Sequence, residues 1–417
     1  MTLGLRENIR QFSLLVLING FVGAMIGLER TLLPLLAGER FAVATAFAAL
    51  SFIAAFGVSK AIANYLSGQL SNRLGRKNIL LGGWIMALPV PVLFWYAPDW
   101  SWILLANVLL GLHQGFAWSS TVIMKIDLVG EKKRGMAMGL NEFAGYVAVA
   151  LAAFGSAWAA QFFAPLTVIV VAGFGIAITG LLMTVIWVRD TRRYMETEAV
   201  ASCRATMRRV FRETTFTNKN LSAVTQAGLV NNLNDGLVWG LLPLMMQAQN
   251  HTVSHIGMVA GLYPLVWGIG QIWTGAWSDR FSRKEFLVLG MLTQGLGILG
   301  FLVSSELLYW LGCSVLLGVG TALVYPVFLS VVADNTHPAQ RAESIGIFRG
   351  WRDLGYAIGA LTTGWISDRL GMETAVAITG WMTVGSGILI WFRMQDLARC
   401  DGQKSGSLLK IFFKKSL

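Results

Sequence analysis

Charged side chains are scarce in this chain of 417 residues: they make up 13% of it, whereas hydrophobic residues make up 55%. Soluble domains carry about a quarter charged residues. Apolar stretches of about 20 residues, long enough to cross a bilayer, recur along the whole sequence. The composition therefore excludes an ordinary soluble globular protein and predicts a polytopic membrane protein.

Cysteine and histidine are also rare, with three and four copies. Cys203 and Cys400 fall in polar segments and Cys313 falls in an apolar stretch, so neither a disulfide framework nor a cysteine metal site is expected. His113 is the single histidine inside an apolar stretch, which is too few for a metal cluster. We therefore expect no metal and no cofactor.

Motifs that carry catalysis are missing as well. The sequence contains no GxxxxGK[ST] phosphate loop, no HExxH zinc motif and no GxSxG nucleophile elbow. The segments between the apolar stretches are too short to hold a folded soluble domain. ATP-driven transport by this chain alone is excluded, and we expect a membrane-embedded function that is not enzymatic.

Twelve apolar stretches are present, and each is expected to form one transmembrane helix. The predicted spans are 11–36, 44–66, 78–96, 101–124, 136–160, 165–188, 221–247, 255–276, 285–303, 306–331, 344–366 and 373–393. The first span is too long and too charged for a cleaved signal peptide. The chain is expected to divide into a first bundle, a cytoplasmic linker, a second bundle and a basic cytoplasmic tail, at 1–188, 189–220, 221–393 and 394–417.

The two halves of the chain repeat each other when the sequence is shifted by 207 residues. Without a gap, the shift superimposes Gly68, Ser71, Arg73, Arg76 and Lys77 on Gly275, Ser278, Arg280, Arg283 and Lys284. It also places a VLLG sequence at 108–111 on an identical one at 315–318. Parallel repeats are typical of transporters with a substrate site between two bundles. The expected fold is an all-α membrane protein of twelve transmembrane helices in two pseudo-symmetric six-helix bundles.

The repeated residues form a loop motif in each half. Residues 68–77 read GQLSNRLGRK and residues 275–284 read GAWSDRFSRK. Both loops resemble the G-x-L-[SA]-D-R-x-G-R-[KR] loop of the major facilitator superfamily. The twelve spans, the half-length repeat and the long central linker agree with that family, so the resemblance covers nearly the entire chain and implies its fold.

In that family, the loop charges form a network that latches the two bundles together on the cytoplasmic side. The resemblance implies this role for Gly68, Asn72, Arg73, Arg76, Lys77, Asp127, Arg134, Gly275, Asp279, Arg280, Arg283, Lys284, Asp334 and Arg341. Asn72 departs from the pattern, because it stands where the family has Asp and it carries no charge. The first latch should therefore be weaker or use Asp127 or Asp334. Loop charges that only set the topology are the alternative.

Two further departures bear on the substrate. Proton-coupled drug exporters of the family carry an Arg three residues before Gln-Gly in the fourth span, where this chain has Gly111 before Gln114. Their fifth-span G-P-x-x-G-G motif is also absent. Drug/proton antiport is therefore not favoured by motif, and the subfamily, the substrate and the direction of transport stay open.

Polar and charged side chains inside the spans supply the candidate site. An ionised group there costs about 2.5–3.5 kcal/mol on insertion scales, so each is expected to be paired, hydrated or functional. The candidate substrate and coupling residues are Glu29, Arg30, Asn107, Gln114, Trp118, Glu142, Asn231, Asn234, Asp235, Trp239, Arg349, Arg352 and Asp353. Arg349 and Asp353, one helical turn apart, also fit a structural clamp. Dry polar contacts between helices are the alternative for the others.

Asp235 is the acid expected to carry a coupling proton, because it lies deep in the seventh span among asparagines. Glu29 and Glu142 come next. A carboxyl group that is shielded from water can take up a proton and release it when its surroundings change. The expected partners are a small-molecule substrate, protons as the coupling ion and membrane lipid, with the chain acting as a monomer.

The basic residues indicate the orientation in the membrane. With both termini in the cytoplasm, 27 of the 33 Lys and Arg fall on inner loops, tails or inner helix ends, and only Arg40 and Arg369 fall outside, as the positive-inside rule requires. The net charge of +11 then reflects topology and does not indicate a nucleic-acid partner. We expect an inner or plasma membrane protein whose linker fits a solvated tether better than an amphipathic helix on lipid.

Together these observations predict a secondary active transporter that moves a small solute by alternating access and draws on the proton gradient. Two alternatives remain. One is a non-transporting membrane receptor or assembly partner with the same fold. The polar side chains within the spans of both halves argue against it. The other is an uncoupled uniporter, which the buried acids oppose.

Overall fold

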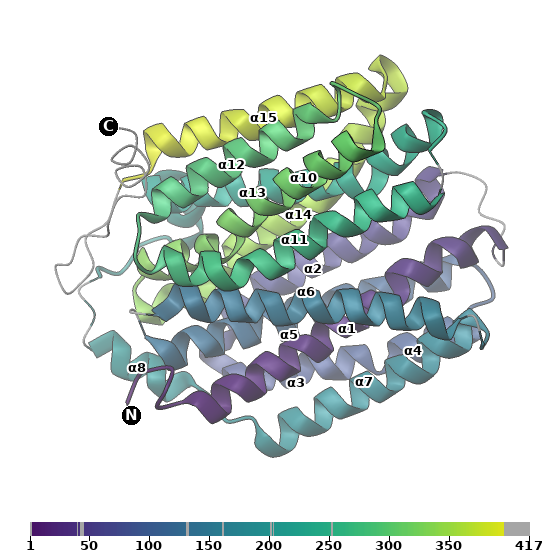
Figure 1. Ribbon diagram of the computed structural model, residues 1–417. Coiled ribbons are helices and arrows are strands. Elements are labelled where there is room, and N and C mark those ends of the chain that lie inside the picture. Colours follow the sequence, from purple (N-terminus) through teal and green to yellow (C-terminus); the bar gives the residue numbers. More distant parts are fainter. Residues whose placement is uncertain are drawn as a thin grey trace. The chain divides into compact units, whose positions relative to one another are not determined.

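The computed structural model describes residues 2–39, 41, 46–130, 133–160, 162–200, 202, 204–251 and 253–395. These residues form helices and no β-strand (Figure 1). The fold class is all-α, as the sequence predicts. Residues 396–417 of the expected basic tail (394–417) lie outside the described residues, as does the side chain of Arg30.

The helices of the first half of the chain are α1 (Ile9–Glu39), α2 (Ala46–Leu74), α3 (Arg76–Ala87), α4 (Pro89–Tyr96), α5 (Trp100–Val129), α6 (Arg134–Ala159), α7 (Pro165–Trp187) and α8 (Arg192–Val200). Those that follow are α9 (Val210–Arg212), the π-helix η2 (Glu213–Thr217), α10 (Lys219–Ala248), α11 (Val253–Ser278), α12 (Arg283–Gly300), α13 (Leu307–Asp334), α14 (Pro338–Leu370) and α15 (Met372–Arg393).

Each predicted span coincides with a helix, except that the third is split into α3 and α4; the ends agree to within eight residues, the largest difference being at the end of α2. The split falls where Pro89 removes a backbone N–H from the helix ladder. The linker contains α8, α9 and η2, so it is a partly helical segment where a solvated tether was favoured.

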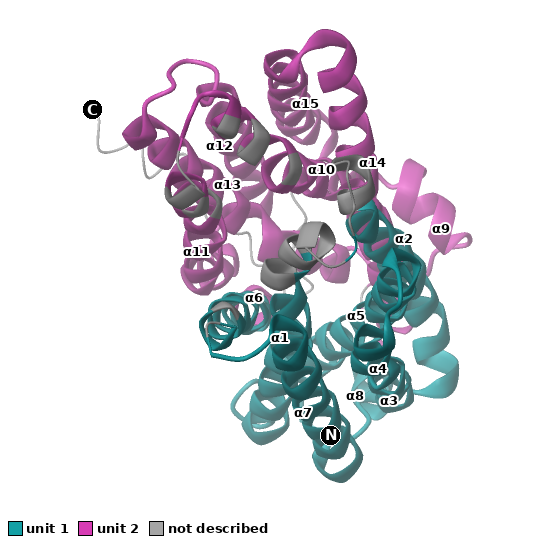
Figure 2. Ribbon diagram, turned by 90° about the vertical axis from the view of Figure 1, so that its right-hand side faces the viewer, with its two compact units in different colours: residues 1–129, 141–198 teal, residues 130–140, 199–417 magenta. Residues whose placement is uncertain are grey.

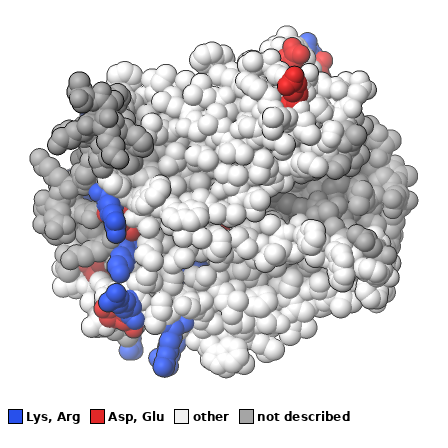
Figure 3. Space-filling model, viewed as in Figure 1, with Lys and Arg blue, Asp and Glu red and all other residues white. Residues whose placement is uncertain are grey.

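Six helical stretches of the described chain are long and apolar enough to cross a membrane: Ile9–Glu29, Arg76–Tyr96, Arg134–Ser156, Pro165–Trp187, Leu307–Asp334 and Met372–Arg393. Lys60 on α2 and Asp235 on α10 are buried charged side chains in two of the other predicted spans. In the face shown in Figure 3, Lys and Arg gather at the end where α8 and the N-terminus lie in Figure 1, and the surface along the helices is nearly free of charge.

Contacts divide the chain into two compact units, drawn in two colours in Figure 2. Unit 1 is Met1–Val129 with Asn141–Glu198, and unit 2 is Gly130–Leu140 with Ala199–Leu417. The helix α6 begins in unit 2 and continues in unit 1.

The same helix pairs pack together in each unit. In unit 1, α5 packs on α2 and α3 while α1 packs on α7; in unit 2, α13 packs on α11 and α12 while α10 packs on α15. Gly111 of α5 faces the carbonyl oxygen of Phe56, and Gly318 of α13 faces that of Tyr263. These two contacts are related by the 207-residue shift, so the repeated glycine serves the same close helix approach twice.

The loops that carry the repeated motif turn by different means. Gly75 has a positive φ of 86° between α2 and α3, a conformation that glycine adopts without steric cost. At the equivalent position before α12, Ser282 is the N-cap, and its hydroxyl accepts from the backbone N–H of Glu285 at 3.4 Å. Both devices start the next helix directly after the loop, which places Arg76 and Arg283 in its first turn.

Candidate functional site

A buried polar cluster in unit 1 joins α1, α5 and α6. Lys125 donates to the carbonyl oxygen of Leu15 at 3.0 Å and also hydrogen-bonds the side-chain oxygen of Asn141. The amide nitrogen of Asn141 donates to Glu142 Oε1 at 2.6 Å. One asparagine therefore bridges a buried base and a buried acid, and Glu142 Oε2 has no hydrogen-bond partner among the described residues.

Trp118 brings aromatic surface to the same acid. Its Nε1 donates to Glu142 Oε1 at 3.2 Å, and its ring lies 5.4 Å from that of Tyr146. The Lys60 ammonium lies 5.7 Å from the centre of the Trp118 ring, within cation–π range. The structure thus adds Lys60 and Asn141 to the predicted Trp118 and Glu142.

The other candidates of unit 1 serve different contacts. Gln114 donates to the carbonyl oxygen of Val22 on α1 at 2.5 Å, whereas Asn107 donates to Ile103 of its own helix at 3.0 Å. Glu29 is buried on α1. The candidate residues of the fourth predicted span therefore divide between a contact to α1, a contact to α6 and a local bond of α5.

In unit 2, Asp235 lies fully buried where α10, α11 and α13 meet. The Tyr263 hydroxyl donates to Asp235 Oδ1 at 2.6 Å and lies 3.3 Å from Thr321 Oγ1. Thr321 donates its own proton to the carbonyl oxygen of Leu317 at 3.0 Å, which leaves the Tyr263 proton for Asp235. The carboxyl group is held by a neutral donor that does not itself fix the charge of the acid.

Aromatic rings extend from this acid towards α14. The Tyr263 ring centre lies 6.4 Å from that of Trp239 and 5.7 Å from that of Trp267, with which it stacks. Trp267 lies 4.9 Å from Tyr325, and the Arg352 guanidinium lies 4.9 Å from the centre of the Tyr325 ring. Trp239 is a predicted member of this row, and the others extend it.

Asp353 lies at the far end of the row. It forms an ion pair with the neighbouring Arg352 at 2.8 Å and accepts from the amide of Asn232 at 3.1 Å. Asn231 in turn donates to Asn232 Oδ1 at 3.2 Å. Arg349 is buried on the same helix, α14. The candidate residues of α10 and α14 are thus brought together, with Asn232 as an additional bridging residue.

Asn234 does not join Asp235, although the two are adjacent in the sequence. It donates to Gln294 on α12 at 3.1 Å and accepts from Thr383 on α15 at 2.8 Å. Successive residues of a helix point about 100° apart, so neighbours can face different helices. The contacts of Asn234 are those of a polar packing residue between α10, α12 and α15.

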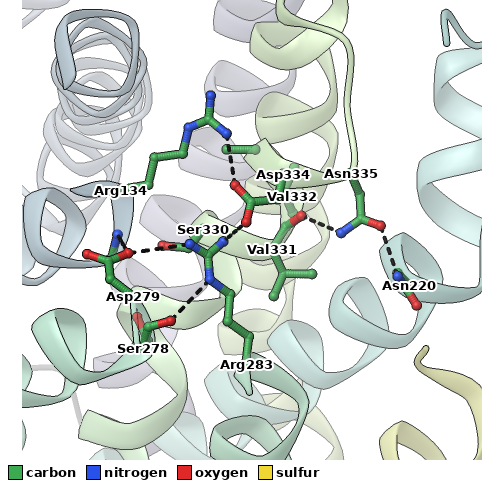
Figure 4. A network of polar contacts seen from close by, with 12 residues as sticks. Arg134, Asn220, Ser278, Asp279, Arg283, Ser330, Val331, Val332, Asp334 and Asn335 are labelled. Carbon is green, nitrogen blue, oxygen red and sulfur yellow. Dashed lines mark hydrogen bonds and ion pairs between the residues drawn. The ribbon is translucent and has the colours of Figure 1, made fainter. Parts of the chain in front are cut away.

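Loop charges of unit 2 form a network around Asp334, shown in Figure 4. Asp334 forms ion pairs with Arg134 at 2.8 Å and with Arg283, which also lies 3.4 Å from Asp279. We call Arg134, Asp279, Arg283 and Asp334 the Asp334 network. It connects the start of α6, the α11–α12 loop and the end of α13.

Asp279 also caps the N-terminus of α6. Its two oxygens accept from the backbone N–H groups of Gly135 at 2.8 Å and Met136 at 2.9 Å, which have no partner within the helix. Burial raises the pKa of Asp279, while Arg283 and these N–H groups act against that rise. Gly275 and Gly139 are in close contact beside it, so α6 and α11 approach closely there.

The first copy of the motif forms the equivalent pair by other means. Arg76 lies 3.1 Å from Asp127, and the Thr191 hydroxyl donates to the same carboxylate at 2.9 Å. The pairs Arg76–Asp127 and Arg283–Asp334 are related by the 207-residue shift. Asp127 supplies the carboxylate beside the arginine of the first loop, where Asn72 brings no charge.

The remaining loop candidates contribute less. Arg73 and Arg280 are exposed, and among the described residues they belong neither to the Asp334 network nor to the Arg76–Asp127 pair. Lys77 donates to the carbonyl oxygen of Val185 at 2.9 Å, and Lys284 lies 5.2 Å from the centre of the Trp391 ring. Further predicted residues of the two loops and α14 are buried or half-buried: Gly68, Asn72 and Arg341.

These features define a polytopic α-helical protein built from a duplicated bundle, with buried acids in its helices and ion pairs at its repeated loops. The family model described as Major Facilitator Superfamily matches residues 13–221 and 224–414, and the chain belongs to this family. The resemblance seen in the loop motifs is thereby confirmed.

Individual relatives are distant. An uncharacterised MFS-type transporter of Methanocaldococcus jannaschii is 24% identical over 204 residues, which cover 48% of this chain and 53% of that protein. The tetracycline resistance protein, class B, of Escherichia coli is 28% identical over 182 residues, which cover 42% of this chain and 45% of that protein. The chain thus spans about half the length of these curated relatives.

Among solved structures, the proton:xylose symporter XylE superposes with a TM-score of 0.74 at 14% identity, covering 93% of this chain and 97% of that chain. At this level of identity the likeness concerns the fold. The protein is therefore a member of a membrane transporter family, with apolar helices embedded in the membrane.

Proposed function

We propose that this protein is a secondary active transporter that couples the movement of a small solute to protons through Asp235. Membership of a transporter family supports the first part. The observation that carries the second is the buried Asp235 carboxyl, which three helices enclose and the Tyr263 hydroxyl holds at 2.6 Å.

The chemistry of this contact suits a proton carrier. When Asp235 is ionised, the Tyr263 hydroxyl stabilises it with a hydrogen bond, and low-dielectric surroundings make that bond stronger than in water. When Asp235 is protonated, it becomes a donor and requires an acceptor. Because α10, α11 and α13 each supply one member of the Asp235–Tyr263–Thr321 chain, a change of protonation alters contacts between three helices.

Glu142 is the second proposed coupling acid. It shares unit 1 with Lys125, and Asn141 connects the two side chains. A buried carboxylate and a buried ammonium that are joined by one amide stabilise each other, so a change in the charge of one destabilises the other. Glu29, Gln114, Trp118, Trp239 and the α14 group Arg349, Arg352 and Asp353 are proposed to contribute to substrate binding.

Alternating access requires that closed ends be held shut in one state and released in the other. The Asp334 network and the Arg76–Asp127 pair are proposed as the cytoplasmic latch. The proposed arrangement has both termini in the cytoplasm, bundles at 1–188 and 221–393, and a monomer in the inner or plasma membrane. One relative is named for tetracycline resistance and a structural neighbour for xylose symport, so the substrate is left to experiment.

Purified protein in liposomes with an imposed pH gradient, screened against pooled metabolites and drugs, tests the proposal. Asp235→Asn should abolish accumulation driven by the pH gradient and retain counterflow exchange, which needs no net proton movement. Asp368→Asn is the matched control, because it makes the same change at an exposed acid of α14. Full accumulation by Asp235→Asn would exclude Asp235 as the coupling acid.

The same assay separates the alternatives. A uniporter would equilibrate its solute without responding to the pH gradient, and a receptor of this fold would show no uptake of any pooled solute. Tyr263→Phe removes only the hydroxyl donor, so it should shift the pH dependence of uptake and leave uptake itself present.

A further inference from the structure

The end of the linker forms a distinct structural element. Residues 208–219, here called the linker anchor, comprise α9, the π-helix η2 and the start of α10. Figure 2 shows α9 outside the group of long helices of unit 2, beside α14. Their sequence, RRVFRETTFTNK, contains four basic residues, two phenylalanines and a single acid.

One face of the linker anchor is bound to the bundle of unit 2. The buried Thr214 hydroxyl lies 3.3 Å from that of Ser344 on α14, and its carbonyl oxygen accepts from Thr225 of α10 at 3.1 Å. Trp351 of α14 donates to the Thr215 hydroxyl at 3.2 Å. Contacts of this kind hold the segment in place along α14.

Two further contacts fix the ends of the segment. The Gln340 side chain makes a pair of hydrogen bonds with the backbone of Met207, at 2.7 and 2.9 Å. Arg393, at the end of α15, donates to the carbonyl oxygen of Phe216 at 2.6 Å. The linker anchor therefore lies at the level where α10 begins and α15 ends, which is the expected boundary of the membrane.

The opposite face is apolar and basic. Phe211 is 43% exposed and Phe216 is 60% exposed. A π-helical turn closes an i to i+5 hydrogen bond, as Asn218 N–H does with the Glu213 carbonyl at 3.0 Å, so residues five apart return towards the same side. Arg208, Arg209 and Arg212 are exposed on the same short segment, as is Lys219.

The single acid offsets only one of the four basic charges of the linker anchor. Glu213 Oε1 accepts from the backbone N–H groups of Arg208 at 2.9 Å and Arg209 at 3.3 Å, so it caps the start of the helix. An anionic lipid surface attracts a segment in two ways, through the insertion of apolar side chains and through the charge of basic ones. The linker anchor has both kinds of side chain, at the end of membrane helices.

We propose that the linker anchor is a lipid-surface anchor that inserts Phe211 and Phe216 among the headgroups of an anionic leaflet, held there by Arg208, Arg209 and Arg212. Because the same segment is bonded to α14 and α15, the contact ties the linker to unit 2 at the membrane surface. The inference requires that the protein is embedded in a membrane but not that it transports a solute. Its test is therefore independent of the proposed proton coupling.

The test uses the full chain with its three cysteines replaced by serine or alanine and a nitroxide label at Thr217→Cys, which leaves both phenylalanines in place. Thr197→Cys on α8 is the matched control, an exposed linker threonine without exposed aromatic neighbours. Collision rates with oxygen and with a water-soluble nickel complex are measured in vesicles of phosphatidylcholine alone and of phosphatidylcholine with phosphatidylglycerol. Unchanged thermal unfolding shows that the labelled variants are folded.

The label at 217 should be exposed to oxygen and shielded from nickel in the anionic vesicles, and the label at 197 should meet nickel in both. Replacing Arg208, Arg209 and Arg212 by Gln should lower the ratio of inserted to free anchor by about fivefold per residue, the factor that corresponds to roughly 1 kcal/mol for each basic side chain near an anionic surface. Equal nickel collision rates at 217 and 197 would overturn the proposal. So would insertion of the label at 217 that is the same with and without phosphatidylglycerol and with and without the three arginines.

Discussion

Asp334 joins two arginines from distant parts of the chain, and its replacement by Asn tests whether the Asp334 network holds the start of α6. The carboxylate lies 2.8 Å from Arg134 and also pairs with Arg283 (Figure 4). Asp334→Asn keeps the size of the side chain and removes its charge. We expect the start of α6 to be released from the α11–α12 loop more often.

The magnitude follows from burial. Removing one partner of a buried ion pair costs about 3–5 kcal/mol, because a buried charge loses its counter-ion. The lower end applies here, since the Asp334 side chain is 14% exposed and Arg283 keeps Asp279 at 3.4 Å. A loss of about 3 kcal/mol corresponds to roughly a 100-fold shift between docked and released states, at 1.4 kcal/mol for each factor of ten.

The assay is alkylation of a single cysteine at Ala137, which is fully buried near the start of α6, in a background without the native cysteines. A water-soluble maleimide should react about 100-fold faster in Asp334→Asn than in the parent, and at the parental rate in the exposed-site control Asp368→Asn. Arg134→Gln alone should give a smaller increase, and adding it to Asp334→Asn should have little further effect. An unchanged rate in Asp334→Asn would refute the reasoning.

Three further outcomes are expected. The pKa of Asp279 is raised in the folded protein, so the stability that this shift contributes is complete below the ordinary pKa of about 3.9 and is lost as the pH rises through the raised pKa. Asp279→Asn should remove this part of the pH dependence of Tm. Identical Tm profiles against pH for the variant and the parent would contradict the raised pKa of Asp279. Gly139→Val should lower stability by about 1–3 kcal/mol, since a side chain there meets the backbone of Gln271, whereas Gly155→Val, on an open face of the same helix, should leave Tm unchanged. Asn234→Leu should lower the free energy of unfolding by about 1–3 kcal/mol, because its buried hydrogen-bond partners on α12 and α15 are left unsatisfied. Transport per folded molecule should persist. A normal Tm together with lost transport would instead make Asn234 a residue of the substrate site.

The sequence was sufficient for the architecture because the physical signals for it are local or repeated. Runs of apolar residues predict membrane helices wherever they occur. The 207-residue shift predicts that the halves pack alike, and Gly111 on Phe56 and Gly318 on Tyr263 confirm this at residue level. The linker was the exception, since α9 and η2 pack on α14 and bond to Arg393 at the end of α15, and such contacts leave no period in the sequence.

Within the candidate site, helical periodicity indicated which residues share a face but not which helix each face meets. Asn234 and Asp235 are neighbours in the chain, yet one bonds to α12 and α15 and the other to Tyr263 of α11. Lys60 and Tyr263 are not among the site residues that the sequence predicts. Their roles depend on Trp118 and Asp235, which other helices supply.

The sequence by itself determined the class of the protein, the duplicated helices and the arginines and acids that the loops would use, because these follow from composition, spacing and repetition. Only the tertiary structure decided the pairing: that Arg134 forms an ion pair with Asp334, that Asp279 caps α6, and that Asn141 stands between Lys125 and Glu142. A charge chooses its partner by distance and burial, and both arise only when helices far apart in the chain pack together.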